Sequence, residues 1–292
     1  MLFASYFFSF LVLLTTVGQS AGQLVKLSPS LLIPTEWADG DSFQIKTPDG
    51  TLQTVRLYGA DCIEWHVTDL TDSRRLSSQR RYFGISGYGG SAKTSIELAK
   101  SLGGNAASET ARILSKPFTI HTAYADARGD AKYKRIYAFV TTSEGNDLAA
   151  HLITMGLARA FGVYRETPDG KSGKDYQEYL RDLELLAVKK GLGAWAKTDW
   201  TQLSTERQQQ RAEDEELHLA TKTSNPAEVL QIDLNTASRD ELMQIPGVGE
   251  VTANRIISGR PYKSFKDLLD IEGMGAKTVE KLAPYFKALT NN

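Results

Sequence analysis

Acidic residues flank two strand-like runs in the first quarter of the chain. Asp39 and Asp41 precede the run 42–47, and Asp61 and Glu64 follow the next run. If the two runs form adjacent antiparallel strands, Asp41 and Asp61 come together. Two carboxylates with carbonyl oxygens and water suit a hard divalent cation, calcium or magnesium. Surface salt bridges and turn residues remain an alternative, because Asp-Gly turns are common.

Two arginines accompany these carboxylates. Arg56 lies on the strand-like run between the acidic pairs, and Arg135 opens a later run, 135–141. Phosphodiester hydrolysis needs an activated water, positive charge on the non-bridging oxygens and help for the leaving oxygen. Carboxylates and paired arginines supply these functions, so the pattern is compatible with phosphodiester chemistry, although spacing alone does not favour it over salt bridges and turns.

The same residues lie in blocks that resemble the thermonuclease (staphylococcal nuclease-like) family. The match runs in order over about 35–200, and its blocks are Asp39-Gly40-Asp41-Ser42, Val55 to Glu64, Lys132 to Val140, Leu152 to Ala158 and Gly191 to Trp195. The resemblance implies an OB-type five-stranded barrel with packed helices. It also implies calcium-dependent hydrolysis of DNA and RNA.

The resemblance further implies individual roles. Each of the following residues matches a functional position of the family: Asp41 and Asp61 as calcium carboxylates, Cys62 as a ligand through its main-chain carbonyl, Asp39 beside the metal shell, Glu64 as the general base or the residue that orients the water, Arg56 and Arg135 as phosphate-binding arginines, and Lys132 and Tyr164 as nucleotide contacts.

This sequence departs from the family pattern at three places. Cys62-Ile63 replaces Thr-Pro or Cys-Pro, so the loop before Glu64 loses a proline that fixes its conformation. Gly162 stands where the family often has a second tyrosine, which predicts weaker base stacking. The connection 65–103 is longer than usual.

The long connection contains two patterns of its own. Gly87 to Thr94 nearly reads as a P-loop, but Ala92 replaces the glycine before lysine and no buried strand precedes it. We therefore expect a flexible turn before a helix and no nucleotide cofactor. The arginines at 74, 75, 80 and 81 either extend the substrate groove or form a solvated surface.

The sequence lacks the residue patterns of other catalytic classes. Cys62 is the single cysteine, so no internal disulfide or cysteine-based zinc finger can form, and no basic partner is evident for a thiol nucleophile. The four histidines are scattered, without zincin or Ser-His-Asp spacing. His151 is expected to be structural.

The C-terminal region contains an internal repeat with an offset of 26 residues. Segment 238–256 aligns with 264–282, with six of nineteen positions identical. Each copy begins with a capping-box pattern, at Ser238 and Ser264, and then predicts helix, tight glycine turn and helix.

This repeat, over about 230–287, resembles the tandem helix-hairpin-helix domain of competence DNA-receptor proteins. Glycines allow close approach to a phosphate, and amides at the following helix N-terminus act as anion donors. The expected DNA-binding residues are Gly247, Val248, Gly249, Gly273, Met274 and Gly275, helped by Arg255, Lys277 and Lys281. Glu250 and Glu272 disfavour phosphate and keep open a structural or protein-docking role.

Four segments must position these residues. Residues 1–22 contain an apolar stretch, 2–17, that predicts a secretory signal peptide or an uncleaved anchor. Residues 23–200 predict a small antiparallel barrel, with strands also at 117–124 and helices at 147–156 and 175–190. Residues 201–229 read as a polar helix or flexible linker, and 230–292 as a small all-α domain. The fold class is therefore α+β.

Charge and composition agree with this division. The chain has 292 residues, 41% hydrophobic, with 34 basic and 35 acidic residues. These values are typical of a soluble globular protein and exclude a disordered, collagen-like or polytopic membrane chain. The acidic excess lies in 201–230, with six acidic and three basic residues.

The sequence as a whole predicts a secreted or periplasmic, calcium-dependent nonspecific nuclease of DNA and/or RNA, with a DNA-binding module. No pattern indicates an obligate protein partner. The alternatives are a non-catalytic DNA-uptake receptor of the cell envelope and, more remotely, an envelope scaffold. The joint presence of Asp41, Arg56, Asp61, Glu64 and Arg135 favours the enzyme.

Overall fold

A computed structural model of the chain describes residues 23–124, 127, 135–223, 232–237 and 239–287. The predicted leader, 1–22, lies outside these residues, as do Lys132 and Ser238. Within the described part of the chain, no helix combines the length and apolarity needed to cross a membrane.

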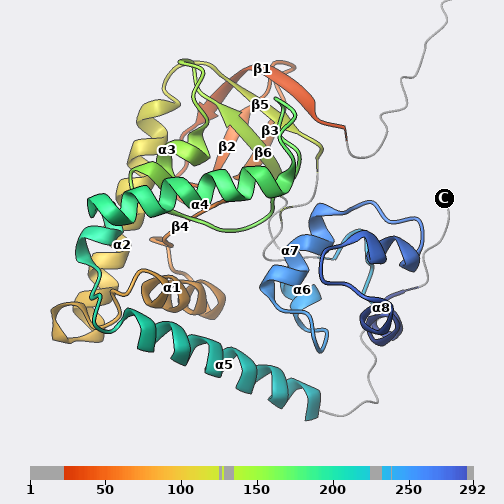
Figure 1. The fold of residues 1–292 in the computed structure, drawn as a ribbon. Helices are drawn as coiled ribbons and strands as arrows, with labels where there is room; N and C mark the ends of the chain where they lie inside the picture. Colours follow the sequence, from red (N-terminus) through yellow and green to blue (C-terminus); the bar gives the residue numbers. More distant parts are fainter. Residues whose placement is uncertain (1–22, 125–126, 128–134, 224–231, 238, 288–292) are drawn as a thin grey trace, which may run out of the picture.

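Five strands form a closed barrel in the order β1-β2-β3-β6-β5 (Figure 1). Their bounds are Val25–Ile33 (β1), Ser42–Lys46 (β2), Leu52–Leu57 (β3), Phe118–Thr122 (β5) and Ile136–Thr141 (β6). The predicted barrel and four of its strands are confirmed. The expectation of an antiparallel barrel is wrong at one pair, because β3 and β6 run parallel and the chain returns to β3 only after β5.

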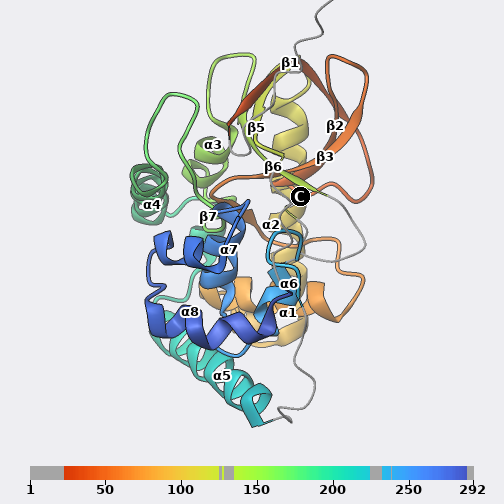
Figure 2. The same cartoon turned by 90° about the vertical axis from the view of Figure 1, so that its right-hand side faces the viewer.

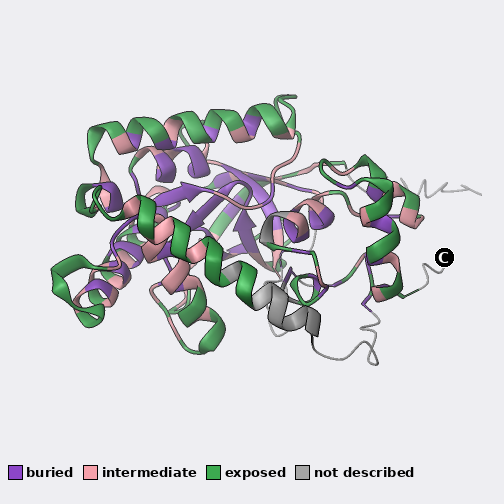
Figure 3. Cartoon of the chain, turned by 60° about the horizontal axis from the view of Figure 1, so that its bottom comes forward, coloured by how far each residue is buried: buried purple, intermediate pink, exposed green. Residues whose placement is uncertain are grey.

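Alternating side chains of these strands fill the barrel. Phe43, Ile45, Val55, Leu57 and Ile120 are all buried, and the register places Phe43 opposite Val55. Strands β2, β5 and β6 are largely buried, β1 has only one buried residue, and the surrounding helices keep one face exposed (Figure 3). The interior is therefore a packed core, and the charged residues must gather at its edge.

Two helices predicted from apolar spacing cover the barrel. Helix α3, Leu148–Thr154, begins at Asp147, whose side chain accepts a hydrogen bond from the Ala149 amide. Helix α4, Gly173–Lys190, ends at Gly191, which adopts the left-handed conformation with φ of 59°. Both predictions are confirmed, and both ends follow ordinary capping chemistry.

The long connection after β4, Ala60–Cys62, folds into helices. Helix α1 spans Leu70–Tyr82; a short 3₁₀ turn at Tyr88–Gly90, in the P-loop-like segment, leads to α2, Ala92–Ile113. Ser91 caps α2, as expected for a turn before a helix. Together with Trp195 from a 3₁₀ turn at Gly193–Lys197, these helices enclose a second hydrophobic core.

The polar segment after the barrel is helical as far as Thr223. This helix, α5 (Leu203–Thr223), lies along α1 (Figure 1). Arg81 pairs with Glu213, with 2.9 Å between Nη2 and Oε1, and Arg207 Nη2 donates to the Tyr82 carbonyl at 2.9 Å. Of the two forms predicted for this segment, the polar helix is therefore the observed one up to that residue.

The C-terminal region consists of short helices joined by glycine turns (Figure 2). They are α6 (Arg239–Met243), α7 (Glu250–Ser258), a 3₁₀ helix (Phe265–Asp270), α8 (Ala276–Leu282) and a last 3₁₀ turn (Ala283–Tyr285). The capping box of Ser264 and Asp267 is confirmed. The helix that it starts is 3₁₀ rather than α, so the two repeats are similar but not identical.

Candidate active site

The two predicted metal carboxylates meet around one arginine. Ser42 pairs with Arg56 in the β2–β3 ladder, which places Asp41 beside the end of β3. Arg56 Nη2 lies 2.7 Å from Asp61 Oδ1 and 3.5 Å from Asp41 Oδ2. All three side chains are buried. The predicted approach of Asp41 and Asp61 is therefore observed.

The turn that carries Asp39 and Asp41 is fixed by α2. Thr110 Oγ1 donates to the Gly40 carbonyl at 2.8 Å. A β-carbon at Gly40 would lie 2.7 Å from Cys62 Sγ and 2.8 Å from Ala106 Cβ. Because both contacts are shorter than side chains tolerate, only glycine allows the acidic turn to pack here.

A second arginine, missed by sequence reasoning, holds Asp61 from the opposite side. Strand β7, Ala158–Ala160, pairs with β4 and places Arg159 opposite Asp61. Arg159 Nε donates to Asp61 Oδ2 at 2.8 Å, and its guanidinium lies 4.1 Å from the Phe161 ring centroid. Burial disfavours the charged Asp61, but Arg159 and Arg56 outweigh it and hold its pKa well below the usual range.

Glu64 is buried beside an arginine from α1. Arg75 Nη1 lies 2.5 Å from Glu64 Oε1. Burial raises the pKa of Glu64, and the Arg75 charge opposes this shift. Of the arginines at 74, 75, 80 and 81, Arg75 is therefore paired with a carboxylate of this site, while Arg80 and Arg81 bond to Ser95 and Glu213. The extension of a substrate groove by these arginines stays a prediction.

Arg135 also faces this cluster, from the start of β6. The parallel pairing of Val55 with Ile136 sets it next to β3. Its Nε is buried and has no hydrogen-bond partner among the described residues. Burial, together with the charges of Arg56 and Arg75, lowers its pKa to about 10. An incoming anion would relieve that unfavourable charge.

The carboxylate and carbonyl oxygens of this site are the kind of ligand that a hard cation prefers. Asp39 Oδ1 is buried without a partner in the described structure, and the pKa of Asp39 is raised by burial and by the charges of Glu64 and Asp41. Among the described residues, Asp41 receives two donors, from Arg56 and Cys62, and both bind its Oδ2. An ion here would offset that local negative charge.

The ligand set itself stays a prediction. Asp61 and the Cys62 carbonyl already accept hydrogen bonds, the latter from Gln79 Nε2 at 2.7 Å. Each keeps a spare acceptor position, since a carboxylate offers about four and a carbonyl two. No three acidic, histidine or cysteine side chains among the described residues are grouped as an ion would require.

Comparisons with known proteins agree with this geometry. Residues 54–197 match the family model of staphylococcal nuclease homologues, and 228–287 match a helix-hairpin-helix motif. The chain carries a staphylococcal nuclease homologue domain. Its closed barrel with packed helices is the OB-type fold of that family, and the helix-hairpin-helix motif follows it in the chain.

One curated relative is described as a deoxyribonuclease. This protein, from Thioalkalivibrio sp. (strain K90mix), is 45% identical over 51 residues, which are 18% of this chain and 14% of the relative. The alignment therefore spans about one-seventh of that protein.

Two further residues predicted for the nuclease homologue domain have different outcomes. Lys132 lies outside the described residues. Tyr164 is half-buried, and its ring lies 6.5 Å from that of Tyr176 on α4. Burial also raises the pKa of Tyr164. Its role in nucleotide binding stays a prediction.

Cys62 contributes backbone groups rather than a nucleophile. Its amide donates to Asp41 Oδ2 at 3.0 Å. Burial, with the nearby charges of Asp41 and Asp61, raises the pKa of the thiol, so the side chain stays protonated.

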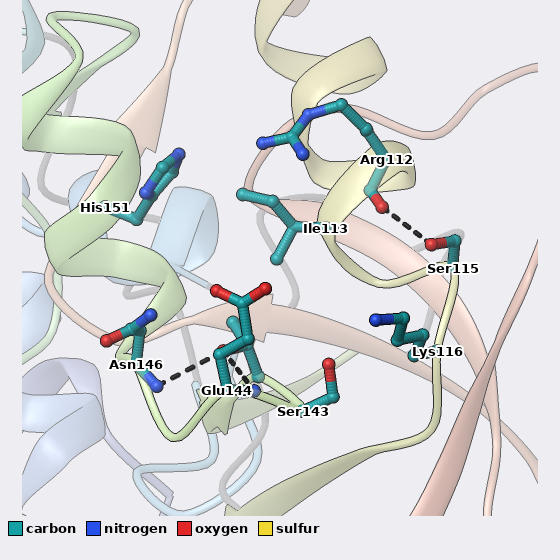
Figure 4. A pocket seen from close by; sticks show the side chains of 9 residues that line it. Arg112, Ile113, Ser115, Lys116, Ser143, Glu144, Asn146 and His151 are labelled. Carbon is teal, nitrogen blue, oxygen red and sulfur yellow. Dashed lines mark hydrogen bonds between the residues drawn. The ribbon is translucent and has the colours of Figure 1, made fainter.

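A pocket of the nuclease homologue domain lies apart from these charges (Figure 4). It is formed by the end of α2, the turn after β6 and α3, and its lining includes Arg112, Lys116, Glu144 and His151. His151 Nε2 lies 2.8 Å from Glu109 Oε1. None of the predicted catalytic residues lines this pocket.

The helix-hairpin-helix turns have the expected backbone. Gly247 and Gly273 have φ of 97° and 86°, and Gly249 and Gly275 cap α7 and α8. The positive φ of Gly247 and Gly273 favours glycine, whereas Gly249 and Gly275 have an ordinary φ of −85° and −81°. The first amides of the helices that follow have no partner within their own helix, so they can bind an anion.

The side chains around these turns differ in their surroundings, and the contacts of this region with DNA stay a prediction. Val248 and Met274 are buried in the core, so their side chains are unavailable to DNA. Arg255 is engaged with Glu272, through the carbonyl at 2.8 Å and the carboxylate at 3.2 Å. Lys277 and Lys281 are exposed.

Proposed function

We propose that this chain is an exported, calcium-dependent nonspecific nuclease that hydrolyses DNA and RNA. We further propose that it binds DNA through its helix-hairpin-helix turns. The observation that carries the proposal is one cluster of buried and half-buried charged residues at the barrel edge. Four carboxylates (Asp39, Asp41, Asp61 and Glu64) interleave there with four arginines (Arg56, Arg75, Arg135 and Arg159).

The cluster suits in-line attack of water on a phosphodiester. Arg56 and Arg135 bind the non-bridging oxygens and stabilise the charge that grows on them in the transition state. Glu64 orients the attacking water or accepts its proton. Asp41, Asp61 and the Cys62 carbonyl would hold calcium with Asp39 beside them, and the ion supplies further positive charge next to the phosphate.

Preorganisation supports a catalytic role over mere binding. Arg56 is already fixed by two carboxylates, and Glu64 by Arg75, so neither needs to reorganise when substrate arrives. Arg135 instead keeps a buried Nε without a partner among the described residues, and its donor is available to a phosphate.

Export and DNA binding have separate support. Export rests on the apolar stretch 2–17 followed by small residues. DNA binding by the C-terminal module rests on the helix-hairpin-helix match and on the glycine conformations at the two turns.

Hydrolysis of labelled DNA and RNA oligonucleotides by the purified protein tests the proposal. Chelation should abolish cleavage, and calcium should restore it. Glu64→Gln should lower the rate by about 10²–10³. Glu109→Gln, which changes a glutamate paired with Arg112 and His151 instead, should leave it unchanged. Full activity in excess EGTA would exclude the calcium requirement, and binding without cleavage would favour a DNA receptor.

A further inference from the structure

Helix α1 contributes a buried glutamine to the proposed active site. Gln79 is fully buried, with an exposed fraction of 0%. It belongs to the connection 65–103, which is longer than in the resembled family. No role follows for it from the motifs that identify the domain. The inference below rests on the proposed hydrolytic function.

The amide group of this side chain contacts three positions of the loop, Asp61, Cys62 and Glu64. Gln79 Nε2 donates to Asp61 Oδ2 at 3.0 Å and to the Cys62 carbonyl at 2.7 Å. Gln79 Oε1 accepts the Glu64 amide at 2.8 Å. Donor and acceptor are both used, so the side chain has a single suitable orientation.

The loop has no proline to restrict it. Ile63 stands at that position, and its side chain is 1% exposed in the second core, with Leu76 and Phe83. Helix α2 presses on the same residue, since a β-carbon at Gly103 would lie 2.2 Å from the Ile63 carbonyl oxygen. Packing from the inserted helices therefore replaces the ring as the constraint on this loop.

We propose that Gln79 is a positioning residue for phosphodiester hydrolysis. It fixes the Asp61 carboxylate and the Glu64 backbone relative to each other, so that both reach the phosphate without rearrangement. Arg75, one turn earlier on α1, fixes the Glu64 carboxylate at 2.5 Å. The inserted helix thus forms one wall of the active site.

A merely structural glutamine would behave differently, and the chain offers a matched control. Ser95 on α2 is also fully buried inside the inserted region. Its hydroxyl donates to the Ile85 carbonyl at 2.5 Å and accepts from Arg80 Nε at 2.7 Å. Ser95→Ala removes buried hydrogen bonds from the same core without touching the loop 61–64.

The experiment compares Gln79→Met with Ser95→Ala in the full chain. Methionine keeps the volume of glutamine and removes all three hydrogen bonds. The readouts are kcat and KM on a short oligonucleotide with calcium, the thermal midpoint, and hydrogen exchange of the Glu64 amide. Gln79→Met should lower kcat by about 10–100-fold with KM changed little, as supporting groups of a site typically do. Its Glu64 amide should exchange at least tenfold faster.

The control and a second variant decide the interpretation. Ser95→Ala should keep kcat within about twofold, whatever its thermal midpoint. Gln79→Glu keeps the acceptor for the Glu64 amide but turns an oxygen toward Asp61, so it should lower kcat at least as much as methionine does. If Gln79→Met does not fold, Gln79→Glu and its exchange rates carry the test.

Three results would overturn the inference. One is a kcat for the folded Gln79 variants within twofold of wild type, with or without a change in exchange. Another is an equal loss of kcat in Ser95→Ala at an equal loss of stability, and the third is unaltered Glu64 exchange. A wild-type protein that cleaves no nucleic acid would refute the proposed function alone, because exchange would still report on the positioning.

Discussion

The barrel edge and the hairpin turns differ in the groups that they offer to a phosphate: charged side chains at the first and backbone amides at the second. At the barrel edge, charged side chains form ion pairs with one another, and Arg56 contacts two carboxylates. At the hairpins, the corresponding groups are the backbones of Gly247 and Gly273, with φ near 90°. The side chains of Val248 and Met274 beside them are buried in the core.

This difference determines what each region tolerates. A buried charged network depends on the identity of each member, because removing one leaves a partner uncompensated. Binding through backbone amides depends instead on the conformation of the turn. Region 231–292 has eight basic and eight acidic residues, so its net charge does not attract the phosphates of DNA. Substitutions can therefore separate the two regions.

The largest expected effect is on stability, at Arg159. Arg159→Met removes the guanidinium that compensates Asp61 Oδ2 while keeping an apolar stem. We expect a loss of about 3–5 kcal/mol in the free energy of unfolding at neutral pH, as for one partner of a buried ion pair. Urea denaturation measures it. Arg112→Met, at an exposed arginine, should change the unfolding midpoint little.

The loss should also depend on pH. Arg159 holds the pKa of Asp61 below its unfolded value of about 3.9. The stabilisation is therefore present above that pH and disappears as the pH falls further. The gap between wild type and Arg159→Met should narrow below about pH 4. A gap that is constant from pH 3 to pH 7 would show that Arg159 acts through packing on Phe161 rather than through charge.

The second largest expected effect is a lower rate of hydrolysis when Arg135 is replaced. Arg135→Ala should lower kcat by about 10²–10³, the usual cost of one preorganised transition-state contact. It should cost little stability, because burial and two neighbouring arginines already disfavour its charge, as the lowered pKa of about 10 indicates. Steady-state hydrolysis and thermal unfolding, with Arg112→Ala as control, separate the two quantities. A near-wild-type kcat would remove Arg135 from the catalytic set.

Sequence reasoning succeeded where spacing along the chain reports spatial proximity. Asp41, Arg56 and Asp61 sit at the ends of consecutive strands, so alternation and turns were enough to bring them together. The glycine turns were equally readable, since a positive φ leaves a direct mark on residue choice.

The same reasoning missed Arg159 and Gln79. Arg159 follows from the pairing of β4 with β7, two three-residue strands about 100 positions apart, and its only local signal is one arginine between two buried alanines. Gln79 has no local signal, because it faces the loop only after α1 packs on a core shared with Phe83 and Trp195. Long-range packing, not residue type, creates both contacts.

The smallest expected effect concerns the hairpins. Gly247→Val with Gly273→Val should weaken binding to long duplex DNA by about tenfold, because a linked second site raises the effective concentration of the barrel near its substrate. Valine strongly resists a φ near 90°. Hydrolysis of a short oligonucleotide should be almost unchanged. A truncation to 1–229 should show the same loss of DNA affinity as the double variant. The matched control is Gly145→Val, because Gly145 lies in a barrel turn with φ of 85° and open space around it.

Salt dependence then separates backbone contacts from general charge. If amides at Gly247–Gly249 and Gly273–Gly275, with exposed Lys277 and Lys281, make the contacts, the double variant should lose only about 2–4 phosphate contacts, each worth about −0.9 in the salt slope. Sequence preference should be weak, since base edges are not engaged. Mobility-shift titrations of calcium-free proteins measure both. Equal affinities for wild type and double variant would assign the hairpins to protein docking or structure, and phosphate binding would then belong to the charged barrel edge alone.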